Sequence, residues 1–372
     1  MDALMGGATA VRPLDRFDAT RFPCTVAAPV DAFLDPARYG EDRRTPLLLA
    51  AAAELPRVPA SAGRVGVFIG AESGRGSLDT LRRLVAAAGR PFDAARFAEG
   101  ARSLADVLSP EVVSPAAPAV ALARLVGAAG PIETVSLACA SGLAAIVEAT
   151  RALRAGECDV AVAGGVGADV DPLMLAGFGK LQALSARGVS CPFDRRRDGF
   201  VVGEGAAVVL LTRAPGPVRV AGVGRSVDAV HLTMPDPEGR GAERAMRAAL
   251  AEAAVSGTPF HRIDVVQAHG TSTPLNDAVE AAALRRLGLP LGAVSSVKGA
   301  LGHWIAGAGA LGFVVAVEAL ANGHLVPTAG LRDPDSDLPH VIGEGRRVEA
   351  RTALVNAFAF GGANASVALA AG

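Results

Sequence analysis

The chain has 372 residues, 51% of them hydrophobic, which is long enough for two domains or one large duplicated core. Its net charge of -1 and its aromatic content of 4% provide no basic surface with stacking rings, which argues against nucleic acid as the main partner. The four cysteines are widely spaced and form no CxxC pair, which argues against a disulfide framework or a structural zinc site. We therefore expect a reducing, cytoplasmic location.

Membrane association is not expected. Residues 1–10 lack the charged start and apolar core of a secretory signal. The most apolar run, at 304–317, is rich in glycine and shorter than the roughly 20 residues that a transmembrane helix needs. It predicts a buried core helix.

Strands and helices alternate along the first half of the chain. Residues 1–40 are polar and interrupted by proline, which predicts irregular structure. Beyond them the hydrophobic patterns predict helices at 45–55, 78–88 and 116–128 and strands at 64–70, 158–165 and 206–212. This alternation is typical of the α/β fold class. The Ala-Pro-Gly-Pro segment at 214–217 is the best candidate for a boundary between two halves.

The second half repeats the alternation. Its patterns predict helices at 243–254 and 277–287 and strands at 217–224, 263–268, 294–297, 352–358 and 365–369. The helix at 277–287 is expected to begin at Asp277, with Glu280 three residues on as in a capping box. Two α/β halves of similar size, 1–215 and 216–372, indicate a duplicated fold.

Residues 134–157 contain the first candidate for chemistry. The alternating run TVSL passes through ACASG into a helical pattern, which predicts a strand, a tight elbow and a helix. Cys139 would lie at the elbow and at the helix N-terminus, where cysteine pKa values fall to about 3.5–7.5 from about 8.5. It is a candidate nucleophile with a lowered pKa. A small buried hydrophobic residue is the alternative, and this stretch alone does not decide between the two.

Two of the six histidines follow strands and lie beside glycines. They are His269 in QAHGTSTP and His303 in KGALGHW, and strand ends are the usual location of chemistry in open α/β sheets. A helix directly after His303 would keep its ring neutral and able to donate one hydrogen bond. A zinc site formed by Cys139 and both histidines is the alternative, disfavoured because the ligands lie far apart in the sequence. The remaining histidines are interpreted as structural: His231, His261, His324 and His340.

Lys298 is informative because lysine is rare in this chain. Only Lys180 and Lys298 are lysines among 36 basic residues, so arginine is the default choice at a surface position. A lysine five residues before His303 indicates a need for a compact ammonium group, most simply beside a buried carboxylate. Lys180 is interpreted as an ordinary surface residue.

Five motifs together resemble a known family. They are ACASG around Cys139, PFDRRRDGFVVGEG at 192–205, AHGTSTPLND at 268–277, VKGALGH at 297–303 and NAFAFGG at 356–362. In this order they resemble the β-ketoacyl-acyl-carrier-protein synthases, the condensing enzymes of fatty-acid and polyketide synthesis. The resemblance extends from about residue 11 to the C-terminus. It implies a thiolase-like fold, with two related halves in five α-β-α-β-α layers, that is usually dimeric.

The resemblance also implies the roles of individual residues. Cys139 would accept the acyl group, and His269 and His303 would drive decarboxylation of the malonyl unit. Lys298 and Glu280 would form a supporting buried ion pair, and the N–H groups of Cys139 and Phe360 would form the oxyanion hole. Phe200, Phe358 and Phe360 would form the acyl pocket and its gate. Thr271 and Thr273 would form hydrogen bonds near the malonyl unit.

The same resemblance specifies partners and cofactors. No metal and no bound cofactor are implied, because the phosphopantetheine arm would arrive on acyl-carrier protein. The second subunit would be an identical chain or a chain-length partner subunit. An acyltransferase on the same scaffold and a non-catalytic chain-length subunit are the alternatives. Both are disfavoured, because Cys139 and both decarboxylation histidines are present.

Three features depart from the family pattern. The family usually begins with an apolar strand before the segment that matches Met1, so we expect a gap or a substitute segment beside the strand at 64–70. Leu137 stands where the family often has threonine. Trp304 and Ala306 stand where smaller residues or glycine are common. These differences bear on substrate identity more than on the type of reaction.

Overall fold

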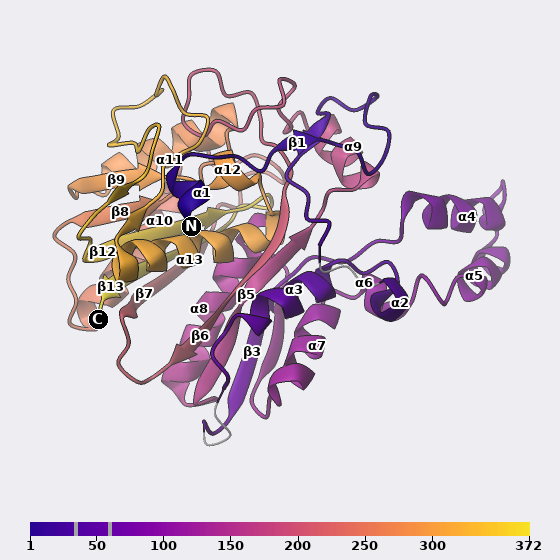
Figure 1. Ribbon diagram of the computed structural model, residues 1–372, viewed down its shortest axis with the longest axis horizontal. Helices are drawn as coiled ribbons and strands as arrows, with labels where there is room; N and C mark the ends of the chain where they lie inside the picture. The colour runs from indigo at the N-terminus through magenta and orange to yellow at the C-terminus, as the bar shows by residue number, and fades with distance from the viewer. Residues whose placement is uncertain (33–35, 59–61) are drawn as a thin grey trace.

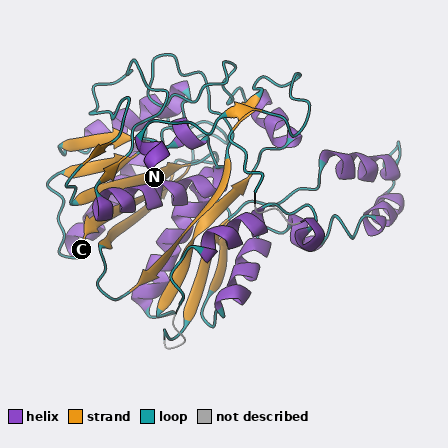
Figure 2. Cartoon of the chain, in the orientation of Figure 1, coloured by secondary structure: helices purple, strands orange, loops and turns teal. Residues whose placement is uncertain are grey.

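The computed structural model describes residues 1–32, 36–58 and 62–372. Two β-sheets are stacked with one layer of helices between them and one on each outer face (Figures 1 and 2). The described part of the chain therefore has the expected α/β class and α-β-α-β-α layering. Sheet strands begin and end within a few residues of the positions that the hydrophobic patterns predict.

The two sheets share one pairing pattern. The first has the order β4 (Ile132–Val135), β3 (Val65–Gly70), β5 (Val160–Ala168) and β6 (Glu204–Thr212). The second has the order β9 (Leu291–Ser295), β8 (Ile263–Gln267), β12 (Thr352–Phe358), β13 (Ala363–Ala371) and β7 (Val218–Val227). In each, three parallel strands are followed by an antiparallel one, β6 or β13. This correspondence is what a duplicated fold requires.

The position of the absent strand differs from the expectation. In the second sheet β7 pairs with the outer edge of β13, whereas no strand among the described residues pairs with the outer edge of β6. The described part of the first sheet therefore has no fifth strand beside β6. The expected place beside β3 was wrong, because β4 and β5 occupy both sides of β3. The order of strands along the chain does not reveal their order in the sheet. It therefore could not show that β6 would lie between the missing strand and the parallel strands.

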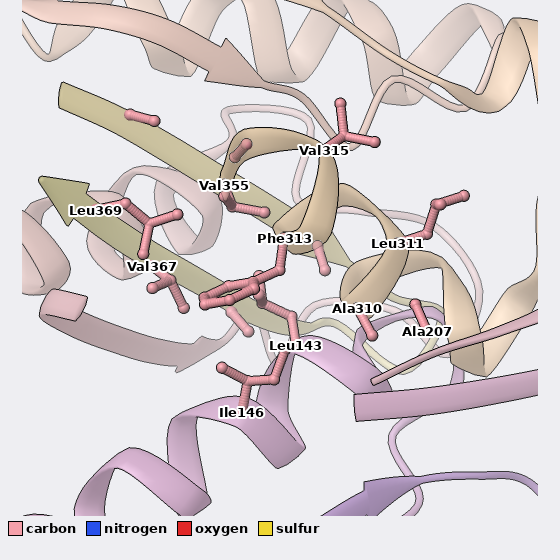
Figure 3. Close-up of a cluster of buried hydrophobic side chains, with 14 of the residues drawn as sticks. Leu143, Ile146, Ala207, Ala310, Leu311, Phe313, Val315, Val355, Val367 and Leu369 are labelled. Carbon is pink, nitrogen blue, oxygen red and sulfur yellow. The ribbon is translucent and has the colours of Figure 1, made fainter. Parts of the chain in front are cut away.

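Long-range packing builds the three helical layers. The central layer consists of α8 (Ser141–Ala155) and α13 (Ala308–Asn322), which contact both sheets. Figure 3 shows Leu143 and Ile146 of α8 beside Phe313 of α13 and Val367 of β13. The outer layers are α3 (Arg44–Ala53) with α7 (Ala117–Val126) on the first sheet, and α10 (Arg240–Val255) with α11 (Pro274–Arg286) on the second.

The remaining elements surround these layers. The helices α4 (Leu78–Ala88) and α5 (Ala94–Ser103) form an arm that projects from the body, at the right of Figure 1. Shorter segments are α1 (Asp2–Met5), α2 (Pro36–Tyr39), α6 (Pro110–Val113), α9 (Pro172–Lys180), α12 (Lys298–Leu301), η1 (Ala138–Ala140), η2 (Ile305–Gly307), and the two-stranded sheets β1 (Arg12–Pro13) with β2 (Val26–Ala27) and β10 (His324–Leu325) with β11 (Arg346–Arg347).

Two further expectations are corrected. The N-terminal 40 residues are not wholly irregular, because they contain α1, β1, β2 and α2. The helix expected to begin at Asp277 begins at Pro274 with Thr273 as its N-cap. The Asp277 carboxylate instead accepts backbone N–H groups of the preceding loop, so it stabilises the loop rather than capping the helix.

The apolar run near residue 304 is longer than the sequence pattern indicated. Residues Ile305–Asn322 form an 18-residue helical stretch that is long and apolar enough to cross a membrane, so the argument from shortness was wrong. Its interpretation as a core helix holds, because 72% of the stretch is buried between the two sheets.

Candidate active site

The expected strand, elbow and helix are present around Cys139. The chain leaves β4 at Val135, passes through η1 and enters α8 at Ser141. Ala138 has φ +46°, a left-handed conformation that a non-glycine residue adopts only where its surroundings hold it. A Cβ on Gly142 would lie 2.8 Å from the Ala306 carbonyl oxygen, so glycine allows α8 to start against the facing segment. Cys139 is 5% exposed at this elbow.

Glu72 holds the elbow in place, a role that no motif in the sequence indicated. One carboxylate oxygen accepts the Ala138 N–H at 2.8 Å and lies 3.1 Å from Ser141 Oγ. The other accepts the Ser136 hydroxyl at 2.8 Å. Glu72 follows β3, and the parallel pairing of β3 with β4 brings the two strand ends together. The one feature of the sequence that could have pointed to Glu72 is its position two residues after the apolar strand β3.

The expected low pKa of Cys139 is not found. Burial raises the pKa of Cys139 to about 12, and the negative charges of Asp169 and Glu72 add to the rise. The Lys298 ammonium and a hydrogen bond from the Phe360 N–H act in the opposite direction. Loss of hydration therefore outweighs the two groups that favour the thiolate.

His303 presents one ring proton to a buried space. Its Nδ1 accepts the Ile305 N–H at 3.1 Å, which assigns the ring proton to Nε2. Among the described residues, this buried Nε2 has no hydrogen-bond partner. Burial and the Lys298 charge hold the pKa of His303 well below 6.5, so the ring is neutral as expected. The causes are burial and Lys298 rather than a helix terminus.

His269 faces His303 and is held through its own backbone. Its N–H donates to a Glu280 carboxylate oxygen at 2.9 Å, and its carbonyl oxygen accepts a hydrogen bond from Lys298 Nζ. Lys298 Nζ also lies 3.4 Å from His269 Nδ1, which assigns the ring proton to Nε2. Burial lowers the pKa of His269, as do the Lys298 charge and His303. The two imidazole centroids are 5.7 Å apart with an interplanar angle of 82°.

Lys298 and Glu280 are both buried, but they do not form the predicted direct ion pair. Glu280 accepts hydrogen bonds from the backbone of His269 and Gly270 and from Asn356 Nδ2. Lys298 instead donates to the His269 carbonyl. Burial lowers the pKa of Lys298 to about 8, while the charge of Glu280 acts to raise it. The two charges therefore interact at longer range, with the His269 backbone between them.

Phenylalanine rings adjoin both histidines. Phe200 lies 5.1 Å from His303, centroid to centroid, in an edge-to-face arrangement. Phe358, at the end of β12, lies 5.7 Å from His269. Both phenylalanines are buried, so they exclude water from the imidazole pair.

The other expected residues also lie close to these loops. The Phe360 ring is 6.4 Å from that of Phe178, in the hydrophobic cluster that contains Cys139. The hydroxyl oxygens of Thr271 and Thr273 are 2.9 Å apart in the loop after His269. The structure thus assembles all ten residues that the resemblance implied around the ends of β4, β8, β9 and β12.

The residues interpreted as ordinary lie outside this cluster. His231, His261 and Lys180 are exposed. His324 pairs with Glu318 at 3.2 Å, and His340 Nε2 bonds Ser336 Oγ at 2.7 Å. The Trp304 ring packs against Gly203 and Gly205. Within residues 1–32, 36–58 and 62–372, no three His, Cys, Asp or Glu side chains are grouped as a metal site, so the zinc alternative gains no support.

Comparison with known families matches most of the sequence. Residues 48–215 match the family described as beta-ketoacyl synthase, N-terminal domain, and residues 218–332 match its C-terminal domain. The chain belongs to the beta-ketoacyl synthase family. The two matched regions meet at the Ala-Pro-Gly-Pro segment.

Relatives of this synthase match along nearly the whole chain. It is 34% identical to the 3-oxoacyl-acyl-carrier-protein synthase 2 of Coxiella burnetii, covering 99% of this chain and 92% of the relative. The protein of the same name from Synechocystis is 33% identical, with 98% and 92% covered.

Solved structures support the fold. A beta-ketoacyl synthase from Burkholderia phymatum superposes with a TM-score of 0.84 at 29% identity, covering 100% of this chain and 94% of that one. The ishigamide ketosynthase/chain length factor superposes with a TM-score of 0.83 at 28% identity, with the same coverage. The thiolase-like fold is thereby confirmed.

Proposed function

We propose that this synthase condenses an acyl group on Cys139 with malonyl-acyl-carrier protein, with loss of CO2, to give a β-ketoacyl-acyl-carrier protein in fatty-acid or polyketide synthesis. The observation that carries the proposal is the buried pair of neutral histidines beside a buried thiol. Both rings hold their proton on Nε2, and the Nε2 of His303 has no partner among the described residues. Such a pair can donate two hydrogen bonds to one developing oxyanion.

The first half-reaction is transfer of the acyl group. Cys139 Sγ attacks the thioester carbonyl, a new C–S bond forms, and the C–S bond to phosphopantetheine breaks. The proton of the Cys139 thiol passes to the departing pantetheine sulfur. The N–H groups of Cys139 and Phe360 would stabilise the intermediate oxyanion, because backbone donors at the elbow need no rearrangement.

The second half-reaction forms the C–C bond. The malonyl carboxylate leaves as CO2, and its electron pair remains on the thioester as an enolate whose oxygen accepts hydrogen bonds from His269 and His303. The enolate carbon attacks the acyl carbon on Cys139. The C–S bond to Cys139 breaks, and one proton from solvent restores the thiol.

The surrounding residues would position these groups. Lys298 and Glu280 hold the His269 backbone from both sides, and Thr271 with Thr273 supplies hydroxyl groups beside it. Phe200, Phe358 and Phe360 would form the acyl pocket and gate. We further propose that the phosphopantetheine arm is supplied by acyl-carrier protein, that residues 1–215 and 216–372 are the two halves, and that the enzyme is cytoplasmic.

Variants at Cys139 and at His303 should fail in different half-reactions. Cys139→Ala is expected to lose acylation while retaining some release of CO2 from malonyl-carrier protein. His303→Ala is expected to become acylated on Cys139 but to lose decarboxylation by about 10²–10³, as oxyanion donors do elsewhere. Intact-protein mass detects the acyl adduct, and labelled CO2 release measures decarboxylation.

The matched control is His261→Ala, because His261 is exposed and outside the site. It should behave as wild type in both assays. Decarboxylation at the wild-type rate in His303→Ala would refute the role given to that ring. Acyl transfer to a second thiol without chain lengthening would support an acyltransferase instead.

A further inference from the structure

Arg197, in the motif PFDRRRDGFVVGEG, has a side chain that is only 7% exposed. A guanidinium carries five N–H groups in one plane, so a buried arginine needs several acceptors. The Nη1 of Arg197 donates to the Asp194 carbonyl oxygen at 3.0 Å and to the Asp335 carboxylate at 2.7 Å. Its Nε and Nη2 donate to the carbonyl oxygens of Thr273 and Pro274 at 3.2 and 3.0 Å. One side chain thus joins three loops.

Two of these acceptors belong to the loop that carries the threonine hydroxyls. Thr273 is the N-cap residue of α11, a position where a threonine hydroxyl ordinarily accepts a backbone N–H of the first turn. Its hydroxyl forms no such bond and instead lies 2.9 Å from the hydroxyl of Thr271. Thr273 is only half-buried. The helix therefore leaves the hydroxyl pair available to a ligand.

The earlier part of this loop is anchored separately. The N–H groups of Thr271 and Ser272 donate to the Asp277 carboxylate at 2.9 and 3.1 Å. Ser272 has φ +67°, a left-handed conformation that a non-glycine residue adopts only where its surroundings hold it. After Ser272, the Thr273 carbonyl accepts the Asp277 N–H only at 3.4 Å. The shorter bond from Arg197 is therefore the stronger restraint on this carbonyl.

The two histidines do not depend on Arg197. Glu280 and Lys298 hold the backbone of His269, and the ring of His303 is held by the backbone N–H two residues further along the chain. Loss of the guanidinium should therefore move the threonine pair and leave both imidazoles in place. Binding of a substrate at the threonines can thus be separated from chemistry at the histidines.

We propose that Arg197 is a positioning residue for the malonyl unit: its planar fork holds the carbonyls of Thr273 and Pro274, so that the hydroxyls of Thr271 and Thr273 face the bound malonyl thioester. The role requires the fork as well as the charge, because a lysine ammonium is a single point that does not reproduce two parallel N–H groups. This inference rests on the condensation proposed above and concerns the same site.

The test compares the two half-reactions in Arg197→Lys. Enzyme loaded from octanoyl-pantetheine is given increasing malonyl-pantetheine, and CO2 release is measured. The KM for malonyl-pantetheine is expected to rise about tenfold, as for one lost hydrogen bond, with kcat changed by less than about twofold. Acylation of Cys139 by octanoyl-pantetheine should keep the wild-type rate. An unchanged KM, or equal losses in acylation and CO2 release, would overturn the inference.

A double-variant cycle tests whether Arg197 acts through the threonines. Thr273→Val should raise the KM for malonyl-pantetheine by a similar factor, and adding Arg197→Lys to it should raise the KM little further. Fully additive effects would contradict the proposal. If Arg197→Lys does not fold, Asp335→Asn takes its place in the cycle, because Asp335 is an acceptor of the same guanidinium.

The matched control is Arg195→Lys, the same exchange two residues away. The Arg195 side chain is 61% exposed and pairs with Asp333 and Asp335, so this variant should keep the wild-type KM. The wild-type enzyme separates this inference from the proposed function. If it is acylated and releases CO2 but Arg197→Lys has an unchanged KM, only the inference fails. If it releases no CO2, the proposed function fails and the inference fails with it.

Discussion

At the residue scale, the environment of Cys139 sets its reactivity. The thiol is buried near two carboxylates, and burial with these charges outweighs the Lys298 charge and the Phe360 N–H in setting its pKa. The resting enzyme should therefore hold a protonated thiol at neutral pH. Protection from oxidation and alkylation between turnovers is a direct consequence, because the thiolate is the reactive form.

Alkylation tests this state of the thiol. Below a pKa of about 12, the thiolate fraction of Cys139 rises tenfold with each pH unit, so its alkylation by iodoacetamide should still be increasing between pH 8 and pH 10. Peptide mapping distinguishes Cys139 from the other three cysteines. A plateau below pH 8 would instead show a stabilised thiolate.

The Glu72 carboxylate should contribute measurably to this profile. Glu72→Gln removes a negative charge that raises the Cys139 pKa, while its amide oxygen can still accept the Ala138 N–H. The alkylation profile should therefore shift to lower pH. Glu133→Gln is the control, because Glu133 lies on the neighbouring strand β4 and is exposed. An unshifted profile would show that Glu72 holds the elbow without affecting the pKa of Cys139.

At the element scale, α13 joins the two halves. Apolar side chains point from α13 in every direction, because both sheets and α8 pack against this helix. Phe313 is 2% exposed and lies beside Leu143 and Val367 in this layer (Figure 3). Substitution here should therefore destabilise both halves together.

Phe313→Ala should lower the free energy of unfolding by about 3–5 kcal/mol, the usual cost of deleting a large core side chain. Chemical denaturation measures the change. Val255→Ala at the end of α10 is the control, because Val255 is 89% exposed and should leave stability nearly unchanged. A loss below about 1 kcal/mol in Phe313→Ala would show that the layer repacks.

At the scale of the whole molecule, an edge strand and the projecting arm both expose apolar residues. The edge strand β4 exposes 48% of Ile132. The arm formed by α4 and α5 projects beyond the sheets and exposes 65% of Val85, while Phe92, between the two helices, is 67% exposed (Figure 1). Open strand edges and exposed apolar patches are typical of protein interfaces.

We expect a dimer that uses the open edge of β4. Ile132→Lys should shift the protein toward monomer in light scattering at micromolar concentration, because a charge on the edge strand opposes pairing. Val255→Lys should leave the oligomeric state unchanged. A dimer that is unaffected by Ile132→Lys would place the interface elsewhere.

The local sequence determined the elements and the residues that do the chemistry. Apolar periodicity located β3, α4, α8 and β12 to within a few residues, because each pattern reflects burial of one face or both. The five motifs identified Cys139, His269 and His303. Cys139 lies in η1 and the two histidines lie in loops, and the neighbours of each residue along the chain identify it.

Only the tertiary structure decided the environment of those residues. The pKa of Cys139 depends on Glu72 and Asp169, which come from other strand ends and lie 67 and 30 residues away along the chain. The predicted contact between Lys298 and Glu280 failed for a similar reason, since the His269 backbone lies between them. Burial and Coulomb interactions depend on distance in space, and a pattern along the chain carries no measure of that distance.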